Sequence, residues 1–89
     1  MLTRTYRSDA FKRRKPMTVV LDGARMRELR LSMGLSQQQV GDAIGRTKAY
    51  VGQVEMEKTM PSVDTAADLQ DFYGIVLHDS GALVIEVKE

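Results

Sequence analysis

The chain has 89 residues, no cysteine, 43% hydrophobic and 28% charged residues. This length predicts one domain with a modest core, and the lack of cysteine excludes disulfides and thiol chemistry. No apolar run approaches the ~18 residues of a membrane helix, and the N-terminus lacks the apolar stretch of a secretory signal, so we expect a soluble cytoplasmic protein.

The net charge of +1 hides a strong asymmetry, because residues 1–16 hold six basic side chains and one acidic one. This segment shows no sustained periodicity and is predicted to be a basic flexible arm. Such an arm is attracted to polyanions, of which nucleic acid is the commonest, although a solvated tail that promotes solubility is an equal alternative on charge alone. Its basic residues are Arg4, Arg7, Lys12, Arg13, Arg14 and Lys15.

Four helices are predicted after the arm. Met17–Leu21 is apolar and β-branched, and fits either a strand or a buried lead-in to the first helix. The helices should cover residues 23–33, 37–44, 48–56 and 62 to about 72, each preceded or opened by a capping side chain and followed by glycine or a loop. The caps are Asp22, Ser36 (with Gln39 as a capping box), Thr47 and Ser62. The inward residues are Met26, Leu29, Met33, Val40, Ile44, Val51, Val54, Val63, Ala66, Leu69 and Phe72 or Tyr73.

A β-hairpin is predicted at residues 75–89. Residues 75–77 and 82–87 are apolar and β-branched, and Gly81 between them can supply the positive φ of a turn. A lone hairpin is marginal in water, so it should pack on the helices, on Met17–Leu21 or on a second copy of the chain. We expect it to be the dimerisation element, beside an arm at 1–16 and a helical domain at 17–74.

Residues 37–56 have the form of a helix-turn-helix. Gly45 tolerates the left-handed backbone of the turn, and Gly41 allows the two helices to cross closely. The second helix buries Val51 and Val54 and leaves Lys48, Ala49, Tyr50, Gly52 and Gln53 outside. In DNA-binding versions, the N-terminal part of that helix enters the major groove.

This unit resembles the lambda-repressor/Cro-like (XRE) family of transcriptional regulators. The residues that carry the resemblance are GLSQQQVGDAIGRTKAYVGQVE at 34–55, together with RELR at 27–30, Pro61-Ser62 and Tyr73-Gly74-Ile75. The resemblance implies a mainly α fold with a four-helix core. Here the C-terminal hairpin would replace the usual fifth helix.

The resemblance also implies roles for matching residues. Lys48, Ala49 and Gln53 would contact bases, since lysine suits guanine, glutamine suits adenine and alanine can meet a thymine methyl. Gln37 would bond a phosphate through its side chain and backbone. Thr47, Tyr50 and Arg46 are further candidates for contact with the DNA backbone. Arg30 and Glu55 match a largely buried ion pair that is structural.

Two positions depart from the family pattern. Arg46 replaces an apolar turn residue, so its stem covers the core or its head reaches DNA. Met56-Glu57 replaces the usual basic residue or asparagine followed by glycine. This change removes one expected phosphate contact and adds an acidic side chain near the interface.

Nothing in the sequence indicates an enzyme. His78, Asp79 and Ser80 are consecutive and cannot converge as a catalytic triad, and one histidine without cysteine offers no metal cluster, so we expect no metal and no cofactor. The predicted function is a regulator, typically a repressor, that binds double-stranded DNA at an inverted-repeat operator as a homodimer on the nucleoid. The alternatives are a DNA-binding antitoxin that also binds a toxin, and an interaction module whose helix-turn-helix no longer binds DNA.

Overall fold

Four helices begin at side chains that cap their first turn. The computed structural model describes residues 1–6 and 17–87 and contains α1 (Gly23–Ser32), α2 (Gln37–Ile44), α3 (Lys48–Glu55) and α4 (Val63–Tyr73). Asp22, Ser36, Thr47 and Ser62 each accept a hydrogen bond from a backbone N–H in the first turn of the helix that follows. All four predicted caps are therefore confirmed, and the helix bounds agree with prediction to within about one residue.

The helices share one core beneath the caps. Its buried helical side chains include Met26, Val40, Val51, Val54, Ala66, Leu69 and Tyr73. Leu29, Ile44, Val63 and Phe72 are partly buried against this cluster. The prediction for Met33 is wrong, because α1 ends at Ser32 and leaves the Met33 side chain 45% exposed.

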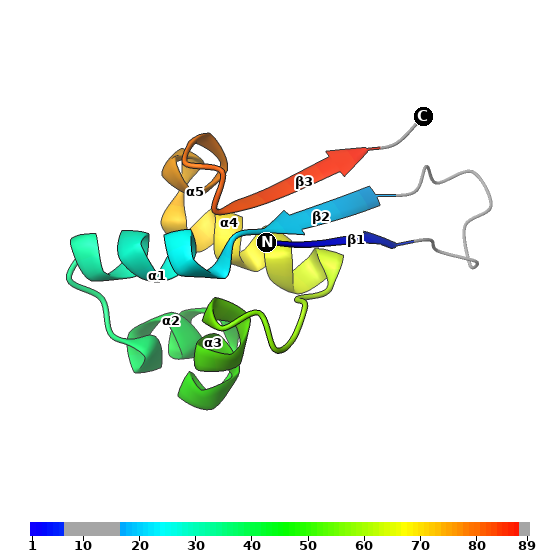
Figure 1. Cartoon of the computed structure of the whole chain (residues 1–89). Helices are drawn as coiled ribbons and strands as arrows, with labels where there is room; N and C mark the ends of the chain where they lie inside the picture. The colour runs from blue at the N-terminus through cyan, green and yellow to red at the C-terminus, as the bar shows by residue number, and fades with distance from the viewer. Residues whose placement is uncertain (7–16, 88–89) are drawn as a thin grey trace.

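A three-stranded antiparallel sheet completes the core. Its strands are β1 (Leu2–Tyr6), β2 (Met17–Leu21) and β3 (Leu83–Val87), with β2 in the middle. The register places Leu21 between Leu2 and Leu83, and the side chains of Leu21 and Leu83 are fully buried. Both β2 and β3 contact α4, so the sheet lies along that helix (Figure 1). Met17–Leu21 is thus a strand, one of the two alternatives left open.

The first residues of the predicted arm form a strand. Leu2–Tyr6 pairs with β2 along its whole length, Leu2 packs against the core, and Thr5 Oγ1 lies 2.9 Å from Thr18 Oγ1. Leu2, at the start of the strand, is partly buried against the core, whereas Thr3 and Arg4 are exposed. The expected arm residues Arg7, Lys12, Arg13, Arg14 and Lys15 lie outside the described residues.

The predicted C-terminal hairpin is wrong. Residues 75–79 form a short helix, α5 (Ile75–Asp79), and β3 pairs with β2 instead. An apolar run of three residues does not distinguish helix from strand by its period. Here α5 buries Leu77 fully, while β3 satisfies its backbone at the edge of β2. A short fifth helix therefore occupies the place where we expected none.

Candidate nucleic-acid interface

A tight turn fixes α2 against α3. Gly45 ends α2 with φ 70° and ψ 32°, a left-handed conformation that favours glycine. A Cβ atom on Gly41 would lie 2.8 Å from the Arg46 carbonyl oxygen and 3.0 Å from that of Thr47, so only glycine fits this approach without a shift. The two helices form a rigid helix-turn-helix, as the sequence predicts.

The outer face of α3 carries the three predicted base contacts. Lys48, Ala49 and Gln53 are exposed, whereas Val51 and Val54 on the opposite face are buried. Neither the Lys48 ammonium nor the Gln53 side-chain amide forms a hydrogen bond or ion pair with another residue of the described ranges 1–6 and 17–87. Their donors are therefore free to bind an external partner.

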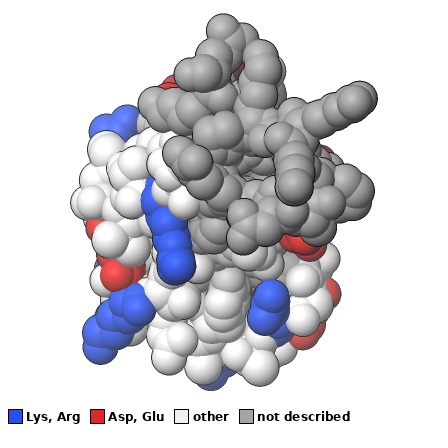
Figure 2. Space-filling model, turned by 90° about the vertical axis from the view of Figure 1, so that its right-hand side faces the viewer, with Lys and Arg blue, Asp and Glu red and all other residues white. Residues whose placement is uncertain are grey.

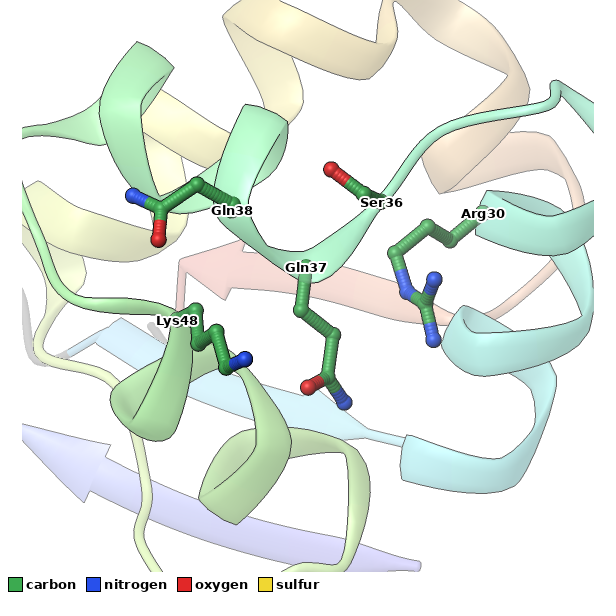
Figure 3. A pocket seen from close by; sticks show the side chains of 5 residues that line it. All are labelled: Arg30, Ser36, Gln37, Gln38 and Lys48. Carbon is green, nitrogen blue, oxygen red and sulfur yellow. The ribbon is translucent and has the colours of Figure 1, made fainter.

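The N-terminus of α2 opens into a hollow of about 330 Å³, which we call the α2 hollow. It is lined by Arg30, Ser36, Gln37, Gln38 and Lys48 (Figure 3). Ser36 and Gln39 bond reciprocally to each other's backbone N–H groups at 3.0 and 2.8 Å, which completes the predicted capping box. The N–H groups of the first helical residues have no intrahelical acceptor, so the hollow combines backbone donors with the Lys48 ammonium and suits an anion.

The side chain of Gln37 is held in place by a hydrogen bond to α3. In Figure 3 its side chain extends from the first residue of α2, with Lys48 to one side and Arg30 to the other. Its Nε2 donates to Glu55 Oε1 at 3.3 Å, and a Cβ atom on Gly52 would lie 3.3 Å from the same nitrogen. One N–H of the amide is therefore committed to the protein, and the second stays available to a phosphate.

Arg30 and Glu55 form the expected ion pair. Arg30 Nε lies 2.7 Å from Glu55 Oε2 and Nη2 lies 3.1 Å from Oε1, with the two side chains 7% and 1% exposed. Arg30 Nη1 also donates to the Leu35 carbonyl at 2.8 Å, and the bond to Glu55 raises the pKa of Arg30. The pair joins α1 to α3 inside the fold, and neither side chain is part of the exposed face of α3.

Tyr73 lies in the core beside this pair. Burial raises the pKa of its hydroxyl to about 12, and the charge of Glu55 acts in the same direction. The hydroxyl is thus neutral at physiological pH. The only charges in this part of the core are those of Arg30 and Glu55, among the residues that the structure describes.

The candidates for backbone contact differ in availability. Thr47 is exposed, and its hydroxyl caps α3 by accepting from Tyr50 N at 3.1 Å. The Arg46 guanidinium lies 5.0 Å from the centre of the Tyr50 ring and donates to Thr65 Oγ1 at 3.3 Å. The exposed Arg46 side chain thus lies over the half-buried Tyr50 and reaches Thr65 of α4.

Glu57 takes a role that the sequence did not suggest. It adopts φ 59°, a left-handed conformation that is uncommon outside glycine, and its Oε2 accepts from Gly23 N at 3.0 Å. The Met1 ammonium, 2.8 Å away, and this backbone N–H lower the pKa of Glu57. Its carboxylate therefore accepts a hydrogen bond from the first residue of α1. The positive charge of the Met1 ammonium lies beside the negative charge that Glu57 adds to this part of the chain.

A second depression, the α1–α3 cleft, runs beside the outer face of α3 and has a volume of about 560 Å³. Its walls are formed by Arg27 of α1, Gln37 of α2 and, around α3, Ala49, Gly52, Gln53, Glu55 and Met56. Arg27 was not among the predicted contacts. The helical period of α1 identifies Met26 as buried but does not show that the next residue lies beside α3.

Basic side chains are scattered on the face that Figure 2 shows. Figure 2 shows the sheet end of the molecule, where the Lys and Arg side chains of described residues stand apart from one another among uncharged atoms. No group of three His, Cys, Asp or Glu side chains in residues 1–6 and 17–87 is placed to bind a metal ion. No helix within these ranges is long and apolar enough to cross a membrane.

Comparison with known proteins gives consistent matches. The helix-turn-helix family model matches residues 26–78. The HTH-type transcriptional regulator DdrOP3 of Deinococcus deserti is 36% identical over 55 residues, covering 62% of this chain and 43% of that protein. The HTH-type transcriptional regulator PuuR of Escherichia coli is 32% identical over 57 residues, covering 64% and 31%. The chain thus spans less than half the length of these relatives, and no solved structure matches it.

Proposed function

Because this chain belongs to the helix-turn-helix family, in its lambda-repressor/Cro-like (XRE) branch, we propose that it is a transcriptional regulator that binds double-stranded DNA in a sequence-specific manner. The observation that carries the proposal is the outer face of α3. Lys48, Ala49 and Gln53 stand exposed on a helix whose other face is locked into the core. A rigid support of this kind holds side chains at fixed positions for contact with base edges.

In this proposal α3 enters the major groove and α2 approaches the sugar-phosphate backbone. Lys48 and Gln53 donate to purine edges, and Ala49 offers a methyl group to thymine. A phosphate occupies the α2 hollow, where it meets the first N–H groups of α2 and the free N–H of Gln37. The exposed hydroxyl of Thr47 is a further phosphate donor.

We propose that the chain acts as a homodimer on an inverted repeat. One eight-residue helix contacts only a few base pairs, so a single copy selects a short half-site. Two copies related by a two-fold axis place their α3 helices in successive major grooves, about 34 Å apart. The exposed apolar residues of α5, Ile75 at 78% and Val76 at 40%, are the surface that we assign to contact between copies. Bound across a promoter in the cytoplasm, such a dimer represses by steric exclusion.

Footprinting on the DNA upstream of the protein's own gene tests this function. We expect two protected half-sites whose centres lie about 10 base pairs, or a multiple of that, apart. Protection of one half-site alone would contradict the dimer. Failure to protect any fragment, together with failure to bind mixed-sequence DNA, would contradict DNA binding itself.

Substitution of Gln53 tests base recognition. Gln53→Ala is expected to weaken binding to the protected sequence by about 1–3 kcal/mol and to relax the preference at one base pair. The matched control is Gln38→Ala, an exposed glutamine that lines the α2 hollow and bonds to Asp42 at 2.8 Å. Any loss it causes should be the same on every sequence and leave every base preference unchanged. Titrations on single-base variants of the site measure both effects. An equal loss on mixed-sequence DNA would reassign Gln53 to the backbone.

A further inference from the structure

The α1–α3 cleft brings a residue of α1 next to the base-contact candidates of α3. Arg27 shares its walls with Gln37, Ala49 and Gln53. Gly52 has no side chain to fill the space, so the cleft stays open along the outer side of α3. The exposed surface beside α3 therefore includes a residue of α1, outside the helix-turn-helix.

Arg27 is a free cation at this place. Its side chain is exposed and makes no hydrogen bond or ion pair with any residue of 1–6 or 17–87. The positions three and four residues away on α1 are Gly23, Ala24, Arg30 and Leu31, so the helix offers it no acidic neighbour.

The carboxylate in the cleft does not neutralise Arg27 either. Glu55 is 1% exposed, and its two oxygens already accept from Arg30 and Gln37. The accessible polar side chains of the cleft are thus the Arg27 guanidinium and the amides of Gln37 and Gln53, each of which can donate a hydrogen bond. A cleft with one positive charge that has no acidic partner there, flanked by amides that can donate, fits an anionic ligand.

The dimensions of DNA indicate which anion lies there. The major groove is about 12 Å wide, and an α-helix with its side chains is about 10–12 Å across. With α3 in the groove, a side chain from a helix packed beside it meets the wall of the groove, which consists of phosphates, rather than the base edges on its floor.

We propose that Arg27 binds a phosphodiester of the DNA backbone at the rim of the α1–α3 cleft. The inference rests on the proposed function and extends the interface from α2 and α3 to α1. Guanidinium donors match phosphate oxygens in geometry and charge. The contact adds affinity without selecting a sequence.

Arg25 provides a matched control on the same helix. It is an exposed arginine two residues away, but its Nη1 donates to the Ser80 carbonyl at 2.6 Å and its Nε lies 4.0 Å from Asp22 Oδ2. Arg27→Ala and Arg25→Ala change the net charge equally, so the general attraction between protein and DNA changes equally in both variants.

The test measures affinity against salt concentration for the footprinted fragment and for a mixed-sequence duplex of equal length. Arg27→Ala is expected to reduce the slope of log K against log salt by about 0.9 relative to Arg25→Ala, which corresponds to about fivefold weaker binding near 0.15 M salt, on both duplexes. Arg27→Lys, which keeps the charge, should retain most of the slope. Thermal melts verify that all variants are folded.

Three results would overturn the inference. If the unaltered protein binds DNA and Arg27→Ala has the same slope as Arg25→Ala, Arg27 contacts no phosphate, while the proposed function stands. If the loss is confined to the footprinted fragment, Arg27 contacts a base instead. If the unaltered protein binds neither duplex, the proposed function and the inference fail together.

Discussion

Replacement of Glu55 by alanine is expected to destabilise the fold by about 3–5 kcal/mol, because it leaves the Arg30 guanidinium buried without its partner. The Arg30 side chain is only 7% exposed and would retain just the Leu35 carbonyl as an acceptor. Gln37 would lose its bond to Glu55 Oε1 as well. For a domain of this size each kcal/mol lowers Tm by about 4–8 °C, so a thermal melt should show a large drop.

Glu28→Ala is the matched control for this prediction. Glu28 is an exposed glutamate of α1 whose side chain has no hydrogen bond or ion pair to another described residue, and its loss should cost less than about 0.5 kcal/mol. A double variant, Arg30→Met with Glu55→Leu, should recover much of the stability, since it leaves no buried charge. A loss under about 1 kcal/mol for Glu55→Ala would place the pair in the class of exposed salt bridges.

Leu21→Ala is expected to cost about 2–5 kcal/mol, because it removes a fully buried side chain from the central strand and leaves a cavity. Leu21 lies between Leu2 and Leu83 in the register, so the cavity opens in the row of side chains that joins the three strands. Urea denaturation measures the change in the free energy of unfolding. The result tests whether the sheet belongs to the same cooperative unit as the helix-turn-helix.

Leu31→Ala makes the same chemical change at a side chain of α1 that is 55% exposed. It should alter stability by no more than about 0.5 kcal/mol. Equal effects of the two substitutions would show that the sheet contributes little to the fold. In that case the three strands would be an appendage to the four helices rather than one wall of their core.

Much of the helix-turn-helix could be predicted because its signals are local. Ser36 caps α2 only three residues from the Gln39 that completes the box, and Gly45 supplies the left-handed turn at its own position. The outward position of Gln53 follows from the helical period once Val51 and Val54 are placed inside. The ion pair of Arg30 and Glu55 spans two helices, and only the family resemblance suggested it.

Contacts between distant segments were missed. The bond between Gln37 and Glu55, the support of Gly23 by Glu57, and the exposure of Arg27 beside α3 each depend on how α1 packs against the helix-turn-helix. A periodic pattern within one helix shows which face is buried but not which neighbour covers it. Arg25 and Arg27 are both arginines of α1, and the sequence does not distinguish them. Only the packing shows that Arg27 lines the α1–α3 cleft while Arg25 bonds to the Ser80 carbonyl.

By itself, the sequence determined four helices, their caps, the turn at Gly45 and the face of α3 that points outward, because these depend on residues within a few positions of one another. Only the tertiary structure decided the pairing of β1, β2 and β3, which joins residues up to about 70 positions apart in the register. Strands pair through backbone hydrogen bonds between segments that are distant in the sequence. The side chains of a short apolar run do not indicate which other segment it will pair with. The sequence therefore predicts an arm at residues 1–16 and a hairpin at 75–89, whereas in the structure Leu2 and Leu83 pair with Leu21 from its two sides.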